Sequence, residues 1–336
     1  MKTKIFITGS SGFIGFHVAK KYLEKGYKVY GFDSMSSYYD TGLKKSRLKI
    51  LKRYKNFLFK KGNLENQKIL DSLVLKFKPS IIIHLAAQAG VRYSIQNPKI
   101  YLNSNLVGTY HILEAAKKLN IKHLIIGSSS SVYGANKKFP FQEIDKSDNQ
   151  ISFYAATKKS TESLAHSYSS LWKIPTTILR FFTVYGPWGR PDMALFLFTK
   201  AIIEGESIKV FNNGDMIRDF TYIDDLIESL LRIIEKIPES NLDFNYADLN
   251  PSESWAPFKI LNIGNSKPTN LMDYISCIED ALGIKAKKEF LPMQPGDVQR
   301  TESDTDSLNK WIGFKPNTSI KDGVNNFVKW YLEFYY

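Results

Sequence analysis

Three glycines at three-residue spacing, Gly9, Gly12 and Gly15, separate a short apolar run from an amphipathic segment near the start of the chain. The apolar run, 4–8, contains β-branched residues and predicts a buried strand, and 13–25 has the apolar spacing of a helix. A helix N-terminus offers free N–H groups and the positive end of its dipole, and glycines let the backbone approach a ligand closely. In this position the glycines predict a pyrophosphate-binding turn; a glycine-rich turn without a ligand is the alternative.

The alternation of strands and helices continues after this first unit. Further strands are expected at 27–32, 57–60, 80–85, 123–127 and 176–181, and helices at 67–77, 105–118 and 154–172. Apolar strands that alternate with helices are typical of a parallel sheet covered on both faces, which right-handed crossovers close as a doubly wound fold. We therefore predict an α/β protein with a Rossmann-type doubly wound parallel sheet.

The pattern changes after about residue 182, where glycine, proline and aromatic residues become frequent. This change divides the chain into a dinucleotide-binding Rossmann domain, 1–182, and a smaller C-terminal lobe, 183–336, that mainly binds substrate. Segments near 220–237 and 260–275 are expected to cross back to the first domain. The polar stretch 238–258 reads as a surface insertion.

Composition excludes several classes of protein. With 336 residues, 43% of them hydrophobic, the chain can bury a large core and is not globally disordered. It has no apolar run of about 18 residues, so no membrane-spanning helix and no membrane partner are expected. The single cysteine, Cys277, excludes a disulfide framework and a cysteine zinc cluster. Since the N-terminus reads as a strand rather than a signal peptide, we expect a cytoplasmic protein.

The net charge of +13 is compatible with a nucleic acid, an anionic small ligand or a lysine-rich composition. Much of it is lysine spread over expected helix and loop surfaces, such as Lys20, Lys21, Lys44, Lys45, Lys117, Lys118, Lys287 and Lys288. Neither an RNA-recognition aromatic signature nor a clustered arginine block is visible. We therefore expect no nucleic-acid partner and a mainly solvated positive exterior.

Asp33, at the end of the second strand, indicates which dinucleotide the turn binds. A carboxylate there can bind both hydroxyls of the adenosine ribose and would repel a 2′-phosphate, so NAD is favoured over NADP. A plain turn residue at a strand end is the alternative. Asn63 could bind the adenine amino group, and small alanines after the strand that ends near His84 would let the cofactor approach. The expected cofactor residues are Gly9, Gly12, Phe13, Ile14, Gly15, Asp33, Asn63, Leu64, Leu85, Ala86, Ala87 and Lys158.

Tyr154 and Lys158 are candidates for proton transfer. They lie four residues apart at the start of an expected helix and so share one face. A free tyrosine has a pKa of about 10, and a nearby ammonium and an oxidised nicotinamide both favour the phenolate and are expected to lower that pKa. A helix-surface pair is the alternative interpretation.

A serine-rich turn, 127–134, follows the strand at 123–127. Ligands of doubly wound sheets bind at the carboxyl ends of strands, so a hydroxyl there can contact a reacting oxygen and pass a proton to Tyr154. Asn105 could support this site's backbone or simply lie in a helix. A glycine turn, strand-end serines and a Tyr–Lys helix, in that order, make coincidence a poor explanation.

These residues resemble those of the extended short-chain dehydrogenases, specifically the NAD-dependent nucleotide-sugar epimerase/dehydratase family, over essentially the whole chain. The resemblance implies that Tyr154 is the catalytic base, Lys158 its partner and Ser129 the catalytic hydroxyl, with Ser130 as the substitute if the alignment slips by one. The family usually has Asp where this chain has Asn63.

The residues after the catalytic hydroxyl narrow the reaction. Family dehydratases carry Asp-Glu there and decarboxylases a nearby Glu, whereas this chain has Ser130 and Ser131. Epimerisation therefore remains. Four stretches resemble the UDP-glucuronate 4-epimerase subgroup: 180–194, 38–44, 88–92 and 256–264.

The chemistry of a uronic acid supplies a separate argument. Oxidation at C4 gives a β-keto acid that is prone to lose carbon dioxide, so an epimerase must hold the carboxylate rigidly. Thr183 can donate a hydroxyl, and Arg190 can bind a carboxylate in bidentate fashion. The resemblance assigns them this role, and it implies that Arg218 and Asp297 bind the nucleotide. The expected substrate residues are Arg92, Ser129, Ser130, Thr183, Arg190, Val210, Phe211, Arg218 and Asp297.

Two other functions stay open. The chain could be a 4-epimerase of UDP-glucose or of a UDP-N-acetylhexosamine, or a noncatalytic dinucleotide- or RNA-binding relative. Family members usually form homodimers through two helices per subunit, here expected within 100–118 and 154–172. No metal is expected, because the histidines lack metal-ligand spacing. The role of Arg300 stays undecided between a second cation of the site and a solvated surface residue.

Overall fold

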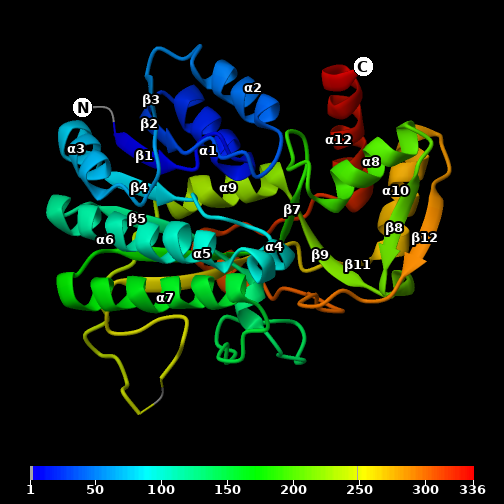
Figure 1. Cartoon of the computed structure of the whole chain (residues 1–336). Helices are drawn as coiled ribbons and strands as arrows, with labels where there is room; N and C mark the ends of the chain where they lie inside the picture. The colour runs from blue at the N-terminus through cyan, green and yellow to red at the C-terminus, as the bar shows by residue number, and fades with distance from the viewer. Residues whose placement is uncertain (1–2, 248) are drawn as a thin grey trace.

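The computed structural model describes residues 3–247 and 249–336 and is built around a seven-stranded sheet (Figure 1). The strand order is β10-β6-β5-β4-β1-β2-β3, and every neighbouring pair is parallel. The strands are β1 (Lys4–Thr8), β2 (Lys28–Asp33), β3 (Phe57–Lys61), β4 (Ile81–His84), β5 (His123–Ser129), β6 (Thr176–Phe181) and β10 (Phe258–Ile263). The predicted doubly wound parallel sheet is therefore confirmed.

Helices cover both faces of this sheet. They are α1 (Phe13–Glu24), α2 (Thr41–Leu51), α3 (Gln67–Phe77), α4 (Val91–Gln96), α5 (Pro98–Tyr101), the π-helical turn η1 (Leu102–Val107), α6 (Gly108–Leu119), α7 (Phe153–Trp172) and α9 (Ile223–Ile233). Side chains of a strand point alternately to its two faces. Accordingly, Ile5 and Ile7 of β1 belong to the core under α1 and α9, while Phe6 belongs to the core under α3, α6 and α7.

The chain after β6 builds a second layer of structure beside the sheet. It contains a parallel pair, β8 (Ser207–Phe211) with β12 (Lys287–Leu291), and a three-stranded sheet of β11 (Pro268–Asn270), β9 (Ile217–Tyr222) and β7 (Thr183–Tyr185). Its helices are α8 (Ala194–Ile203), α10 (Leu271–Leu282), α11 (Asp306–Ile312) and α12 (Ile320–Tyr335), with a short 3-10 turn, η3 (Asn212–Gly214). Another 3-10 turn, η2 (Ser130–Tyr133), directly follows β5. Part of this region returns to the main sheet, because β10 pairs with β6 and α9 packs against α1.

The order of the strands fixes where ligands can approach. β1 and β4 are neighbours, but the chain leaves them in opposite directions across the sheet, so a crevice opens beyond their carboxyl ends. Thr8 and His84, the last residues of the two strands, lie opposite each other. Their side chains are joined by a hydrogen bond of 2.7 Å.

Neither a membrane-spanning helix nor a metal site is found in the described part of the chain. None of the helices that they form is long and apolar enough to cross a membrane. Within residues 3–247 and 249–336 there is also no group of three or more histidine, cysteine or acidic side chains arranged to hold a metal ion.

Asp219, on β9, ties three separate segments together. Its side chain is fully buried and accepts hydrogen bonds from the backbone N–H groups of Asn265 (2.8 Å), Ser266 (3.1 Å) and Ser303 (2.9 Å), and from the Ser303 hydroxyl at 2.5 Å. Four donors converge on two oxygens, so this position requires an acceptor that has no hydrogens of its own.

We therefore expect Asp219→Asn to lower the free energy of unfolding by about 3 kcal/mol, because an amide N–H₂ would face backbone donors and leave buried groups unpaired. Urea unfolding at pH 7 measures the change. Asp280→Asn is the control, since the Asp280 side chain is 72% exposed. Equal losses in the two variants would contradict the assigned role of Asp219.

Candidate active site

A cavity of about 1200 Å³ lies over the carboxyl ends of β1, β4 and β5. Most residues expected from the sequence line it: Gly9, Gly12, Phe13, Ile14, Gly15, Asp33, Asn63, Leu64, Leu85, Ala86, Ala87, Arg92, Ser129, Ser130, Tyr154, Lys158, Thr183, Arg190, Phe211 and Asp297. Residues that are far apart in the chain thus meet at one site.

The glycine turn at the N-terminus of α1 is shaped by close backbone contacts. Gly12 N–H donates to the Gly9 carbonyl at 2.9 Å, and Gly9 has a φ of +73°. A Cβ atom on Gly15 would lie 2.0 Å from the Gly9 carbonyl oxygen, and one on Gly9 would lie 2.9 Å from the Ala86 nitrogen. Only glycine therefore fits these positions, and the helix end is left open to the cavity.

Asp33 is part of the same turn. Its carboxylate accepts hydrogen bonds from Ser11 N–H at 2.9 Å and Met35 N–H at 2.8 Å, and it lines the cavity. The hydroxyls of Ser10 and Ser11 are buried without a hydrogen-bond partner. These two residues do not line the cavity, so it is the glycine cradle and the strand-end carboxylate that suit a dinucleotide with a pyrophosphate bridge and free ribose hydroxyls.

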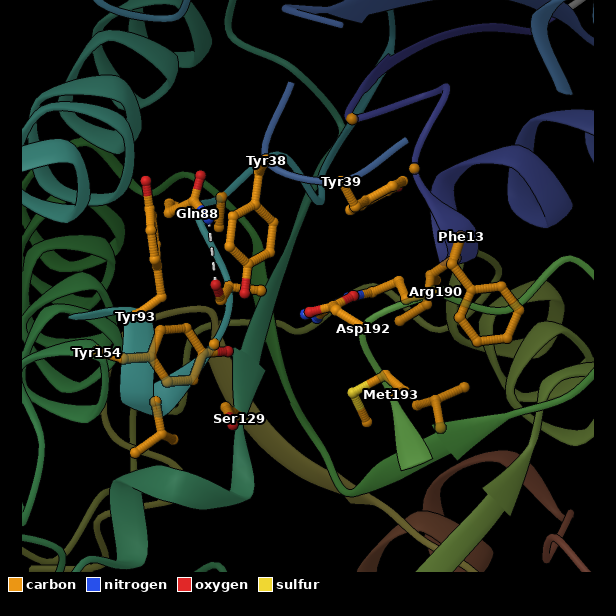
Figure 2. Close-up of a pocket in the computed structure, with 18 of the residues that line it drawn as sticks. Phe13, Tyr38, Tyr39, Gln88, Tyr93, Ser129, Tyr154, Arg190, Asp192 and Met193 are labelled. Carbon is orange, nitrogen blue, oxygen red and sulfur yellow. Dashed lines mark hydrogen bonds and ion pairs between the residues drawn. The ribbon is translucent and has the colours of Figure 1, made fainter. Parts of the chain in front are cut away.

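The proposed catalytic groups meet where β5 ends (Figure 2). Ser129 lies beside Tyr154 at the cavity, and its hydroxyl donates to the Ser131 hydroxyl at 3.1 Å. Lys158, one turn along α7, donates from Nζ to the Gly127 carbonyl at 2.7 Å. Helix α7 begins at Phe153 because the Ser152 side chain caps it by accepting from Ala155 N–H at 3.1 Å.

Burial dominates the ionisation of these groups. It lowers the pKa of Lys158 to about 8, although Glu162 opposes the shift. It also raises the pKa of Tyr154, against the effects of the Ser129 hydroxyl and of the positive charge of Arg190. The expected lowering rests on a neighbouring ammonium together with an oxidised nicotinamide; among the protein's own groups, desolvation of the phenolate outweighs the favourable neighbours.

Asn105 supports the backbone of the site and also lies in a helix. It belongs to the π-helical turn η1, where its side chain accepts from Gln88 N–H at 2.7 Å and donates to the Gln88 carbonyl at 3.1 Å. It also donates to the Thr157 hydroxyl on α7 at 3.0 Å. These bonds fix the segment after β4 to α7. Asn105 therefore both supports the backbone of the site and lies in a helix.

Arg190 points into the cavity opposite Tyr154, but its guanidinium is already paired (Figure 2). Nε and Nη2 donate to the two carboxylate oxygens of Asp192 at 3.0 and 2.5 Å. Burial favours the neutral acid, yet the pairing with Arg190 holds the pKa of Asp192 below its usual range. Sequence reasoning did not single out Asp192, although it lies two residues after Arg190 in the stretch that resembles the epimerase subgroup.

Two expected substrate residues do not reach the cavity wall. Val210 is fully buried, because the alternation of β8 turns it toward the core and turns Phe211 to the cavity. Arg218 donates to the carbonyls of Ile217 and Gln299 at 2.9 and 3.0 Å, and its charge interacts with that of Asp297.

Two further arginines, Arg92 and Arg300, differ in their relation to the cavity. Arg92 pairs with Asp297 at 3.4 Å and lies 5.2 Å from the Phe211 ring centre, at the cavity. Arg300 does not line the cavity; it pairs with Glu302 and lies over the Phe139 ring.

Comparisons with known proteins agree with this geometry. The family model "NAD dependent epimerase/dehydratase family" matches residues 5–247. The chain belongs to this family. The protein CapI of Staphylococcus aureus is 52% identical, with 99% of each chain covered. A probable UDP-glucuronate 4-epimerase of Rhizobium meliloti is 50% identical over 98% of this chain and 96% of that protein.

Solved structures give the same family. The crystal structure of UDP-glucuronic acid 4-epimerase from Bacillus cereus, in complex with UDP-glucuronic acid and NAD, is similar with a TM-score of 0.89 and 32% identity. The match covers 99% of this chain and 100% of that one. Members of this family depend on NAD, and the cradle at Gly9, Gly12 and Gly15 fits that cofactor.

We expect Gly15→Ala to weaken NAD binding by at least about 100-fold, because the new methyl group would displace the backbone that faces the pyrophosphate. Titration of NAD into protein stripped of nucleotide, followed by calorimetry, measures the loss. Gly313→Ala is the control: its φ of +63° strains the new residue, but nothing lies within 4 Å of its added Cβ and it ends α11, outside the cavity. Retained affinity in Gly15→Ala would contradict the assignment of the turn.

Proposed function

We propose that the chain interconverts UDP-glucuronate and UDP-galacturonate by NAD-dependent 4-epimerisation, with no net redox change. The observation that carries this proposal is that Ser129 and Tyr154 lie side by side in one cavity with the glycine turn and with Arg190. The similarity to a probable UDP-glucuronate 4-epimerase and to the Bacillus cereus enzyme supports it.

The residues divide the reaction between them. Bound NAD supplies the acceptor, and later the donor, of the hydride at C4. Tyr154 takes the proton of the C4 hydroxyl while Ser129 orients the oxygen, so that the sugar becomes a 4-ketone. The ketone turns about its diphosphate link and presents its other face. It regains a hydride at C4 on that face, and Tyr154 returns the proton to the oxygen. Lys158 favours the phenolate form of Tyr154 and thereby its action as a base.

Two of the expected substrate residues, Arg218 and Val210, take different roles in this proposal, and the others keep theirs. Thr183 and Arg190 would hold the sugar carboxylate, and Arg92, Ser130, Phe211 and Asp297 line the wall near the nucleotide. Arg218 would act on the diphosphate through its charge. Val210 would support Phe211 from the core instead of touching the uracil.

The assembly and setting of the protein belong to the same proposal. We keep the division into a NAD-binding domain, 1–182, and a substrate lobe, 183–336, and a cytoplasmic location in a pathway of polysaccharide biosynthesis. Helices near 100–118 and 154–172 would form the interface of a homodimer. Exposed apolar residues on this part of the surface support that choice: Leu102, Val107, Tyr110, Leu171 and Trp172.

The purified protein is expected to convert UDP-glucuronate into UDP-galacturonate, and Tyr154→Phe is expected to lose at least about 100-fold in kcat, since it removes the proton-transfer group. Chromatography of the UDP-sugars after incubation measures both. The variant should still bind NAD, which separates a loss of chemistry from a loss of cofactor. No UDP-galacturonate above background with the parent protein would overturn the proposal.

Arg190→Ala tests the choice of sugar. We expect it to reduce kcat/KM for UDP-glucuronate by about 100-fold, because a bidentate charged contact is lost, while any activity on UDP-glucose changes far less. Arg300→Ala is the matched control, since Arg300 pairs with Glu302 as Arg190 pairs with Asp192 but lies away from the cavity. Equal losses on both sugars would favour the UDP-glucose or UDP-N-acetylhexosamine alternative.

A further inference from the structure

One face of α7 is attached to the end of β5 by successive side chains. Lys158 binds the Gly127 carbonyl, and Glu162, one turn further along, accepts from the Ser128 hydroxyl at 2.6 Å. Ser128 directly precedes Ser129. The helix that carries Tyr154 and the strand that carries Ser129 are therefore held in register by two adjacent contacts.

Glu162 is itself held by a buried cation. Arg180, on β6, donates from Nε and Nη2 to the two Glu162 oxygens at 3.0 and 2.9 Å, and both side chains are buried. Arg180 lies opposite Ser128 in the pairing of β5 with β6, and its guanidinium lies 4.8 Å from the Tyr133 ring centre. The Glu162 carboxylate is thus bound by side chains of both β5 and β6.

We propose that Glu162 is a positioning residue for catalysis: with Arg180 it fixes α7 on β5, and it supplies the counter-charge that keeps Lys158 an ammonium. This inference rests on the proposed function of Tyr154 as the base, since the ammonium acts by stabilising its phenolate. A buried ion pair is weak evidence for a contribution to stability. We therefore assign this pair a role in positioning the catalytic groups.

The charged groups around Lys158 decide how it titrates. Glu162 is the carboxylate that favours its charged form, against burial. His84, on β4, interacts with the Lys158 charge, but burial lowers the pKa of His84 to about 3, so it stays neutral in an assay near neutral pH. Arg180, on β6, is bound to Glu162, and Lys159, on α7, pairs with Glu162 at 3.9 Å. Tyr154 lies on α7 itself.

Glu162→Gln is the first test, because it keeps the size of the side chain and removes its charge. Loss of the carboxylate disfavours the ammonium, so the alkaline limb of the kcat profile is expected to move to lower pH by about one unit, a tenfold change in the ratio of the two protonation states. KM for the UDP-sugar should stay within about twofold, since Glu162 does not bind substrate.

Glu279→Gln is the matched control. Glu279 is equally buried and pairs with two lysines, but it lies on α10, away from the cavity. Its pH profile should superimpose on that of the parent. A purely structural role for Glu162 would lower the melting temperature and leave the alkaline limb in place, so that result would overturn the inference.

Glu162→Gln leaves Arg180 as an unpaired buried charge and can fail to fold. The double variant Glu162→Gln/Arg180→Gln removes both charges and keeps the test open. Its alkaline limb is also expected at lower pH than that of the parent. An unshifted limb in the double variant contradicts the inference.

A second measurement does not use activity. Lys158 has a lower pKa in the folded protein than in the unfolded chain, so its contribution to stability rises with pH above the folded pKa of about 8. The difference in unfolding free energy between each protein and its Lys158→Met counterpart, followed from pH 6.5 to 9, is expected to begin its rise at lower pH without Glu162.

The two measurements separate this inference from the proposed function. If the parent is inactive on UDP-glucuronate while the stability rise still shifts on removal of Glu162, only the proposed function fails. If the parent is active and neither the alkaline limb nor the stability rise shifts, only this inference fails.

Discussion

The contact between α7 and the end of β5 is the interaction on which the site depends. Lys158 reaches the Gly127 carbonyl over only 2.7 Å, and that contact turns the start of the helix toward the end of the strand. Ser129 and Tyr154 belong to different elements, and they meet because these elements are held at this spacing. The parallel sheet supplies the carboxyl end of the strand, and the helix supplies the base above it.

A second buried cation connects the two halves of the cavity. Arg47, on α2, is fully buried and donates to the Ser11 carbonyl of the glycine turn at 3.0 Å and to the Trp188 and Gly189 carbonyls at 2.5 and 3.1 Å. Gly189 directly precedes Arg190. The turn that faces the cofactor and the loop that faces the sugar therefore share one anchor, and a guanidinium fork is suited to hold several carbonyls at once.

The sequence predicted what depends on local spacing. The glycines of the first turn, the Tyr154–Lys158 pair and the strand-end serine are each encoded within a few residues, and the order of strands follows from general rules of chirality. The sequence did not predict what depends on distant partners. That Arg218 lies behind the cavity wall, bound to the carbonyl of Gln299, is set by packing that no short pattern records.

Packing and weak local patterns also explain where the sequence-based prediction differs from the structure. Val210 lies next to Phe211, and the phase of a short strand decides which of the two faces the cavity. Helix α2 is rich in lysine and has a weak apolar face, so its residues gave no clear helical signal. The π-helical turn η1 interrupts the apolar period before α6, which is why the sequence placed the start of that helix at residue 105.

The ion pair of Arg190 and Asp192 makes binding of an acid sugar an exchange of partners. A carboxylate that arrives at the guanidinium competes with one that the protein already provides. The free energy of that step is then the difference between two similar ion pairs, which is smaller than either of them. Because Asp192 is the partner of the guanidinium whenever no acid sugar is bound, Arg190 is never left as an unpaired buried charge.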